Sequence, residues 1–255
     1  MSNGSGFNGC YASHIVIRKG TRVIKLPNEI SDSLGATINC ALATMVNTVE
    51  QIPENVKRSR NKVLVQGDGM LGLYGCALLK EFGFKQVYCS GNHPGRDKLI
   101  EKLGAIPVNI GKYKKIITFF SRMSYHFRFF KDLDELKDQS NQFDCVIEVC
   151  GVSDAVKQGI MLLKPGGAYI FVGMVHPKTS FDITGESIIR KCLTLKGIHN
   201  YQGRHLENSV DFLKKNVKKY PFEEMVGPNL YGLDQLPEAI EMAKTKAYPR
   251  ICVKP

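Results

Sequence analysis

The chain has 255 residues, enough for one large α/β domain or for a domain and a fragment of another. Its hydrophobic content of 43% is ordinary for a globular protein, and no apolar run reaches the roughly 18 residues of a transmembrane helix. The first residues form no secretory signal, so we expect reduced cysteines, a cytoplasmic protein and no membrane partner. The net charge of +11 is scattered along the chain, which favours a solvated basic surface over a nucleic-acid partner.

The first sixty residues alternate between short apolar runs and polar connections. Period-two patterns predict strands at Tyr11–Ile17 and Val23–Pro27. Ser31–Ser33 is expected to cap a helix that runs from about Leu34 to Gln51. A polar connector, Ile52–Asn61, then leads into the next part of the chain.

From Lys62 onward, short apolar runs alternate with helix-length segments. Strands are expected at 63–65, 86–89, 106–110, 145–149, 169–172 and 194–197. Helices are expected near 73–82, 96–103, 153–163, 206–215 and 236–244, with a tight turn at Pro165–Gly167. This alternation predicts an α/β fold with a doubly wound parallel sheet of the Rossmann type.

Three glycines, Gly67, Gly69 and Gly72, form the pattern G-x-G-x-x-G between a predicted strand and a predicted helix. The first glycine permits the tight turn, the second lets a pyrophosphate approach the backbone, and the third lets helix and strand pack closely. The helix start at Met70 and Leu71 offers free N–H groups and a partial positive charge to phosphates. The pattern therefore predicts a dinucleotide site; the alternative is a glycine-rich turn without a ligand.

The segment after the second predicted strand bears on the choice of cofactor. Sites for NAD usually carry Asp or Glu about 20 residues after the first glycine, where it binds the ribose 2′-hydroxyl. Residues 87–96 contain no carboxylate and offer Asn92, His93 and Arg96 to a 2′-phosphate. The sequence therefore favours NADP, with NAD as the alternative; Arg96 could also simply begin a helix.

Several blocks in order along the chain resemble one family. They are Tyr11–Val16, Pro27, Cys40–Thr44, Val63–Gly72, Leu103–Ala105, Ile147–Gly151, Leu163–Gly167, Val172–Gly173 and Leu195–Gly197. From about Gly9 to Pro255 the chain resembles the medium-chain dehydrogenase/reductase superfamily, the zinc-type alcohol dehydrogenases. Cys40–Thr44 and Gly69–Leu73 look most like the alcohol dehydrogenases associated with phosphonate breakdown.

The resemblance implies an NAD(P)-dependent oxidoreductase that transfers hydride between nicotinamide and a small alcohol or carbonyl substrate. It also implies a homodimer formed edge to edge through the sheet. Much of the family's GroES-like catalytic domain has no counterpart here. We therefore expect a remnant of that β domain at 1–36, a linking helix and connector at 37–61, a Rossmann dinucleotide-binding domain at 62–245 and a C-terminal strand at 246–255.

Cys40 falls where the resemblance places the last protein ligand of a catalytic zinc. Such a zinc needs three protein ligands, and one thiolate cannot hold it alone. We therefore interpret Cys40 as a vestigial or shared metal ligand; the alternative is a small buried thiol. Thr44 follows one helical turn later, and the resemblance places it against the nicotinamide as the second candidate catalytic residue.

Other site residues also follow from the resemblance. Val149, Gly151, Val172 and Met174 end two central strands and are implied to flank the nicotinamide ring, although the valines also suit plain core packing. Arg250 is implied to pair with the pyrophosphate; the alternative is a solvated terminal arginine.

Two further features have no catalytic role in this interpretation. Glu148 lies inside a predicted strand and is implied to be a structural carboxylate. The segment Gly111–Lys131 is rich in basic and aromatic residues and does not fit the family pattern. A membrane or single-stranded nucleic-acid surface is one interpretation of it, and we favour an insertion or an artefact of the gene model.

Three functions stay open on the sequence. The first is an oxidoreductase of the alcohol dehydrogenase type, which this chain alone could lack the residues to complete. The second is a non-catalytic NADP(H)-binding protein, and the third is a zinc-independent NADPH reductase. The substrate and the oligomeric state lie beyond what the residues indicate.

Overall fold

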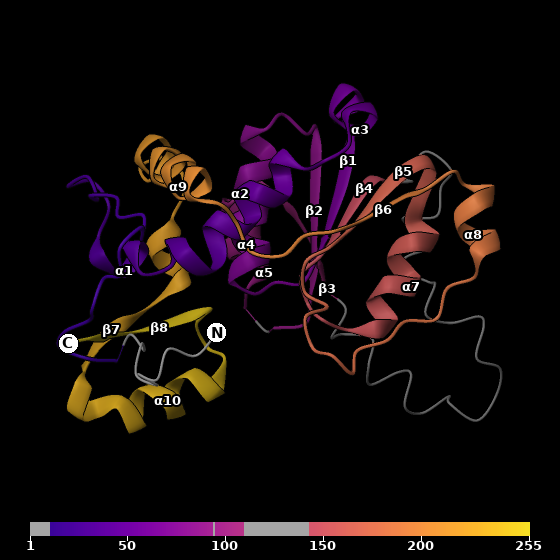
Figure 1. Ribbon diagram of the computed structural model, residues 1–255. Coiled ribbons are helices and arrows are strands. Elements are labelled where there is room, and N and C mark those ends of the chain that lie inside the picture. Colours follow the sequence, from indigo (N-terminus) through magenta and orange to yellow (C-terminus); the bar gives the residue numbers. More distant parts are fainter. Residues whose placement is uncertain (1–10, 94, 110–142) are drawn as a thin grey trace, which may run out of the picture.

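The computed structural model describes residues 11–93, 95–109 and 143–255, so the segment Gly111–Lys131 lies outside the described residues. Six parallel strands form one sheet in the order β3-β2-β1-β4-β5-β6 (Figure 1). Their bounds are β1 Lys62–Gln66, β2 Gln86–Gly91, β3 Ile106–Asn109, β4 Phe143–Glu148, β5 Leu163–Phe171 and β6 Thr194–Gly197. The predicted doubly wound parallel sheet is confirmed.

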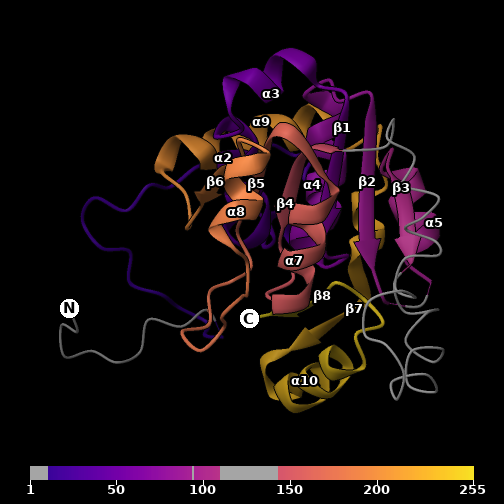
Figure 2. The same cartoon turned by 90° about the vertical axis from the view of Figure 1, so that its right-hand side faces the viewer.

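Helices cover both faces of this sheet (Figures 1 and 2). One face carries α2 (Ala43–Glu50), α4 (Met70–Glu81), α5 (Asp97–Lys102) and α9 (Gly203–Asn216). The other face carries α7 (Ser153–Leu162), and α8 (Gly185–Arg190) follows in the connection to β6. No helix in this described part of the chain combines the length and apolar character needed to cross a bilayer.

The strands alternate their side chains between the two faces. Val63 and Val65 of β1 enter the core beneath α4, whereas Leu64 packs with Val156 and Ile160 of α7. Both faces are buried, which explains why β1 reads as a continuous apolar run rather than as an alternating one.

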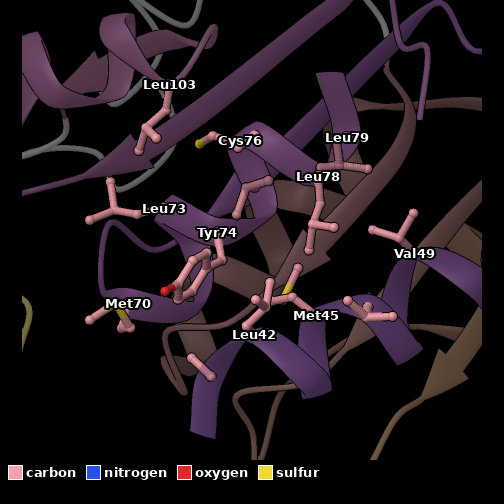
Figure 3. Close-up of a cluster of buried hydrophobic side chains, with 14 of the residues drawn as sticks. Leu42, Met45, Val49, Met70, Leu73, Tyr74, Cys76, Leu78, Leu79 and Leu103 are labelled. Carbon is pink, nitrogen blue, oxygen red and sulfur yellow. The ribbon is translucent and has the colours of Figure 1, made fainter. Parts of the chain in front are cut away.

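The largest core lies between α2, α4 and the sheet (Figure 3). Leu42, Met45 and Leu73 are completely buried, and so is Tyr74. The Tyr74 hydroxyl lies 2.6 Å from Thr37 Oγ1, so the polar end of this buried ring is satisfied by the segment that precedes α2. Residues N-terminal to the sheet are thus part of the same core.

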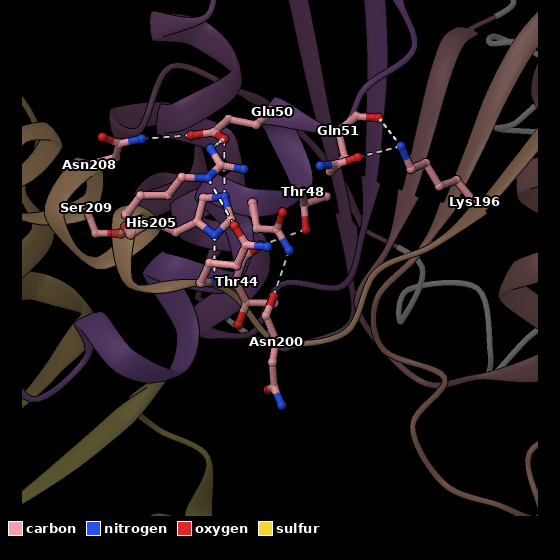
Figure 4. Close-up of polar contacts among 12 residues, drawn as sticks. Thr44, Thr48, Glu50, Gln51, Lys196, Asn200, His205, Asn208 and Ser209 are labelled. Carbon is pink, nitrogen blue, oxygen red and sulfur yellow. Dashed lines mark hydrogen bonds and ion pairs between the residues drawn. The ribbon is translucent and has the colours of Figure 1, made fainter. Parts of the chain in front are cut away.

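A cluster of polar contacts joins α2 to α9 (Figure 4). Glu50, at the end of α2, accepts hydrogen bonds from Arg204 and Asn208 and lies 3.2 Å from His205 Nε2. Burial alone would raise the pKa of Glu50, but the hydrogen bonds from Arg204 and Asn208 and the charge of His205 lower it below its usual value. Asn47 donates to the Asn200 carbonyl at 2.8 Å, which ties the loop after β6 to α2.

A smaller sheet lies apart from the six-stranded one. It pairs β7 (Val226–Gly232) in parallel with β8 (Arg250–Lys254), and α10 (Leu236–Thr245) connects them (Figure 2). A groove of about 970 Å³ is lined by Tyr231 of β7 and by residues of α10. The predicted C-terminal strand is therefore present, and β7 and α10 lie with it; the predicted domain boundaries stay predictions.

Two strands expected near the start of the chain are wrong. Residues 11–30 contain no strand, and Ile15, Val16 and Val23 are 62%, 88% and 64% exposed. A strand needs a neighbour to satisfy its backbone, and the apolar pattern alone does not supply one. No strand of the described chain pairs with this segment.

Three other local predictions need correction. The expected helix from Leu34 to Gln51 is broken at Cys40, whose φ of −137° and ψ of 84° are not helical. The expected connector contains α3 (Glu54–Ser59), with Pro53 as its N-cap. Pro165–Gly167 lies within β5, where Gly166 has a φ of +76° and the register with β4 shifts.

The α2–α4 core provides a stability test. Met45→Ala should lower the free energy of unfolding by about 3 kcal/mol, because it removes a fully buried side chain and leaves a cavity. Met161→Ala, at a side chain 49% exposed, is the matched control and should change it by about 0.5 kcal/mol or less. Urea denaturation measures both, and equal effects of the two variants would contradict this packing.

Candidate functional site

The glycine turn lies at the carboxyl end of β1, between β2 and β4. Gly67 has a φ of +128° and donates its N–H to the Ser90 carbonyl at 2.8 Å, so the turn is attached to the end of β2. A Cβ at Gly72 would lie 1.8 Å from the Gly67 carbonyl oxygen, which no side chain can tolerate. The first turn of α4 therefore packs against the end of β1 only because position 72 is glycine.

The start of α4 presents backbone N–H groups without a side-chain cap. Gly69 is the N-cap, and the first helical bond runs from Leu73 N to Gly69 O at 3.0 Å. Met70 and Leu71 precede that bond in the first turn. A Cβ at Gly69 would meet no atom within 4 Å, so the backbone is open on that side. Such an uncapped helix start behind an open glycine fits the phosphates of a dinucleotide.

Arg250, the first residue of β8, lies within electrostatic reach of Tyr74 on α4. Its Nη2 donates to the Cys40 carbonyl at 2.7 Å, while its buried Nε has no partner within the described chain. Burial raises the pKa of Tyr74 on α4 to about 12, and the charge of Arg250 opposes that shift. An unpartnered guanidinium donor within electrostatic reach of α4 fits an anionic group there.

A carboxylate from the glycine turn lies beside the end of β2, and the sequence did not predict its role. Asp68, inside the glycine turn, is buried, and a Cβ at Gly91 would lie 2.1 Å from its Cγ. Asp68 Oδ2 accepts from the His93 backbone N–H at 2.9 Å, and Oδ1 lies 2.5 Å from His93 Nδ1. Asp68 lies outside residues 87–96, where an acid is expected in an NAD site; the sequence signal for it is a charged residue between two glycines of the motif.

Arg96 points inward rather than toward the surface. Its Nη1 donates to the Asp68 carbonyl at 2.6 Å and its Nη2 to the Lys246 carbonyl at 2.9 Å. The side chain is 8% exposed. Burial lowers the pKa of Arg96 and Asp68 opposes the shift. The Arg96 side chain therefore supports the backbone around the turn after β2. Asn92 and His93 form the more exposed part of that turn.

Glu148 holds the loops that follow β4 and β5. Its buried carboxylate accepts from the backbone N–H of Cys150 at 2.8 Å, of Gly151 at 2.5 Å and of Gly173 at 3.1 Å. Burial and the adjacent Glu148 raise the pKa of the Cys150 thiol to about 11, so this thiol is not an activated nucleophile. One carboxylate thus fixes both loops at the carboxyl ends of the strands.

The four residues expected around a nicotinamide lie at these same strand ends. A Cβ at Gly67 would lie 3.0 Å from Val149 Cγ2, and a Cβ at Gly151 would lie 2.8 Å from the Gly173 carbonyl. Val172 and Met174 line a hollow of about 290 Å³ together with residues of β6 and the loop that follows it. The structure brings all four to the edge of the sheet that carries the glycine turn.

Cys40 does not fit a zinc site within the described residues. Cys40 is exposed. Among the residues that the structure describes, no three or more His, Cys, Asp or Glu side chains gather as a metal site would require. Burial raises the pKa of Tyr201, and nearby Cys40 adds to the shift. The break at Cys40 also removes the continuous helical turn expected between it and Thr44, which lies partly buried at the start of α2.

Several known dehydrogenases are similar to this chain. The L-threonine 3-dehydrogenase of Pyrococcus abyssi is 28% identical over 239 residues, which cover 93% of this chain and 62% of the relative. The chain therefore spans about three fifths of that relative's length. An alcohol dehydrogenase structure from Thermotoga maritima is 24% identical with a TM-score of 0.76, covering 96% of this chain and 64% of that one.

Two further solved structures contain a nicotinamide cofactor. A putative zinc-binding dehydrogenase from Sinorhizobium meliloti, bound to NADP, is 20% identical with a TM-score of 0.71, covering 91% of this chain and 62% of that one. A short-chain alcohol dehydrogenase from Escherichia coli, complexed with NADH, is 17% identical with a TM-score of 0.66, covering 90% and 61%. At these identities the likeness establishes the fold alone.

Glu148 gives a local test of the strand-end loops. Glu148→Ala leaves the N–H groups of Cys150, Gly151 and Gly173 without their acceptor, which should lower the free energy of unfolding by about 3 kcal/mol. Amide exchange at these residues, followed by NMR, should accelerate. The exposed Glu101→Ala is the control and should leave both measurements unchanged; unaltered exchange in Glu148→Ala would contradict the assigned contacts.

A family model supplies the final comparison. The model described as zinc-binding dehydrogenase matches residues 71–215, which is more than half of the chain. The matched range contains α4 from its second residue on, the strands β2 to β6 and the loops held by Glu148. On this match, with the glycine turn and the sheet order already described, the chain belongs to the zinc-binding dehydrogenase family.

Proposed function

We propose that this chain forms the cofactor-binding part of an NAD(P)-dependent oxidoreductase of the alcohol dehydrogenase type. The observation that carries the proposal is the glycine turn, where Gly72 packs against Gly67 and leaves the backbone at Gly69 open beside an uncapped helix. This turn lies where a doubly wound sheet binds its ligand, at the carboxyl ends of the strands. The similar dehydrogenases support the same activity.

Different residues at the strand ends would contact different parts of the cofactor. The N–H groups at the start of α4 and the guanidinium of Arg250 would hold the pyrophosphate. Val172 and Met174 would pack against the nicotinamide ring in the hollow beside β6. Bound nicotinamide supplies the hydride chemistry, and the protein orients its ring against a small alcohol or carbonyl substrate.

We propose NADP as the cofactor, with NAD as the alternative. The turn after β2 carries Asn92 and His93 at its more exposed positions and has glycine where an NAD site has a carboxylate. One similar structure is bound to NADP, which supports the proposal, and another is complexed with NADH.

Two alternative functions have a specific observation in their favour. The residues described around Cys40 do not assemble the three ligands of a catalytic zinc. A non-catalytic NADP(H)-binding protein and a zinc-independent NADPH reductase both need only the cofactor site. Cys40 as a vestigial ligand and Thr44 as a contact of the nicotinamide stay predictions, as do edge-to-edge homodimerisation and a cytoplasmic location.

The open side of Gly69 tests the cofactor site. Gly69→Ala should fold, because φ of −78° and ψ of −173° suit any residue and no atom lies within 4 Å. Its methyl group would stand where the pyrophosphate approaches, so the Kd for NADPH should rise about tenfold or more, a cost of about 1.4 kcal/mol.

Gly185→Ala is the matched control, because a Cβ there also meets nothing within 4 Å and the residue begins a helix away from the turn. It should bind NADPH as the unaltered chain does. Fluorescence titration measures all three proteins. If a folded Gly69→Ala variant bound NADPH as tightly as the unaltered chain, the glycine turn would not be the binding site.

A further inference from the structure

The carboxylate of Asp68 fills a place that belongs to a different residue in most dinucleotide sites. The acid that binds ribose usually stands at the end of the second strand. Here that end is Gly91, and a Cβ built on it would lie 2.1 Å from Asp68 Cγ and 2.2 Å from Oδ2. A carboxylate from the glycine turn thus occupies the space of the absent side chain.

Both oxygens of Asp68 are committed to His93 rather than to the open site. Oδ2 accepts from the backbone N–H at 2.9 Å, and Oδ1 lies 2.5 Å from Nδ1 of the ring. An ionised carboxylate can only accept, so Nδ1 carries a hydrogen and Nε2 is the ring nitrogen left for a ligand. The Asp68 side chain is 5% exposed, whereas that of His93 is 26% exposed.

Arg96 and Cys89 are the other charged or titratable side chains beside this pair, and both have backbone partners. Arg96 Nη1 lies 4.0 Å from Asp68 Oδ1, but the guanidinium donates to two backbone carbonyls. Cys89, on β2, donates to the Gly67 carbonyl at 3.6 Å, and a hydrogen bond with Cys76 together with complete burial raises the pKa of its thiol. Among these groups His93 is the one that combines exposure with the ability to gain a positive charge.

We propose that Asp68 is a positioning residue for His93, and that this pair recognises the 2′-phosphate of NADP(H) by taking up a proton. The inference rests on the proposed function. When the phosphate binds, Nε2 of His93 takes a proton from solvent and donates it as a hydrogen bond to a phosphate oxygen. The imidazolium then lies between two anions, Asp68 and the phosphate, and each favours its charged form. NAD(H) has no 2′-phosphate and therefore brings no second anion to His93.

Proton linkage tests this directly. Calorimetric titration of the full chain at pH 8, in two buffers of different ionisation enthalpy, measures protons taken up on binding. An ordinary histidine is neutral at that pH and a phosphate monoester, with a second pKa of about 6, is already dianionic. NADPH should therefore bind with net proton uptake, and NADH with none.

Variants separate positioning from support of the fold. Asp68→Asn keeps an acceptor for the His93 N–H but loses the charge, so NADPH affinity should fall about tenfold with little change for NADH. His93→Gln should abolish proton uptake, and Asp68→Asn should weaken NADPH no further in that background. Asp97→Asn, which removes a nearby carboxylate from the start of α5, is the charge control and should retain proton uptake.

Several results would overturn the inference. One is NADPH binding without proton uptake in the unaltered chain. Another is an Asp68→Asn variant that binds NADPH more tightly, because the carboxylate would then simply repel phosphate; equal weakening of both cofactors would show a merely structural role. If Asp68→Asn does not fold, His93→Gln at the partly exposed ring decides the question. Failure of a folded chain to bind either cofactor would instead reject the proposed function itself.

Discussion

The close contact between Gly72 and the Gly67 carbonyl is the constraint on which the site depends. A Cβ at position 72 would lie 1.8 Å from that oxygen, so any other residue would push α4 away from the end of β1. The same contact brings the N–H groups at the start of α4 to the carboxyl ends of the strands. Since α4 is also the central helix of the largest core, the geometry of the ligand site and the packing of the fold are set together.

Two buried carboxylates complete the arrangement by organising backbone rather than by meeting ligand. Glu148 collects N–H groups from the loops after β4 and β5. Asp68 fixes the turn after β2 through the backbone and ring of His93. A buried charge is costly without such partners, so each carboxylate stabilises one defined loop conformation. The positions that would surround a dinucleotide are thereby held before any ligand binds.

The sequence predicted the parts of this fold that depend on local pattern. All six strands of the main sheet were located, and the glycine turn was identified from spacing and context alone. The strand expected at Tyr11–Ile17 was not formed, because pairing depends on a neighbour that periodicity does not reveal. Asp68 was missed for a related reason: its partner His93 is 25 residues away along the chain and adjacent only after β1 and β2 pair. The role expected for Arg96 likewise ignored the carbonyl groups that folding brings to it.

Hydrogen–deuterium exchange with and without NADPH tests the central claim most directly, because it reports where the chain binds cofactor. The account predicts slower exchange at Gly67–Leu73, at the end of β2 and in the loops after β4 and β5. It predicts no change along α10, which lines the larger groove of about 970 Å³. Protection confined to α10 and β7, with exchange at the glycine turn unaffected, would contradict it.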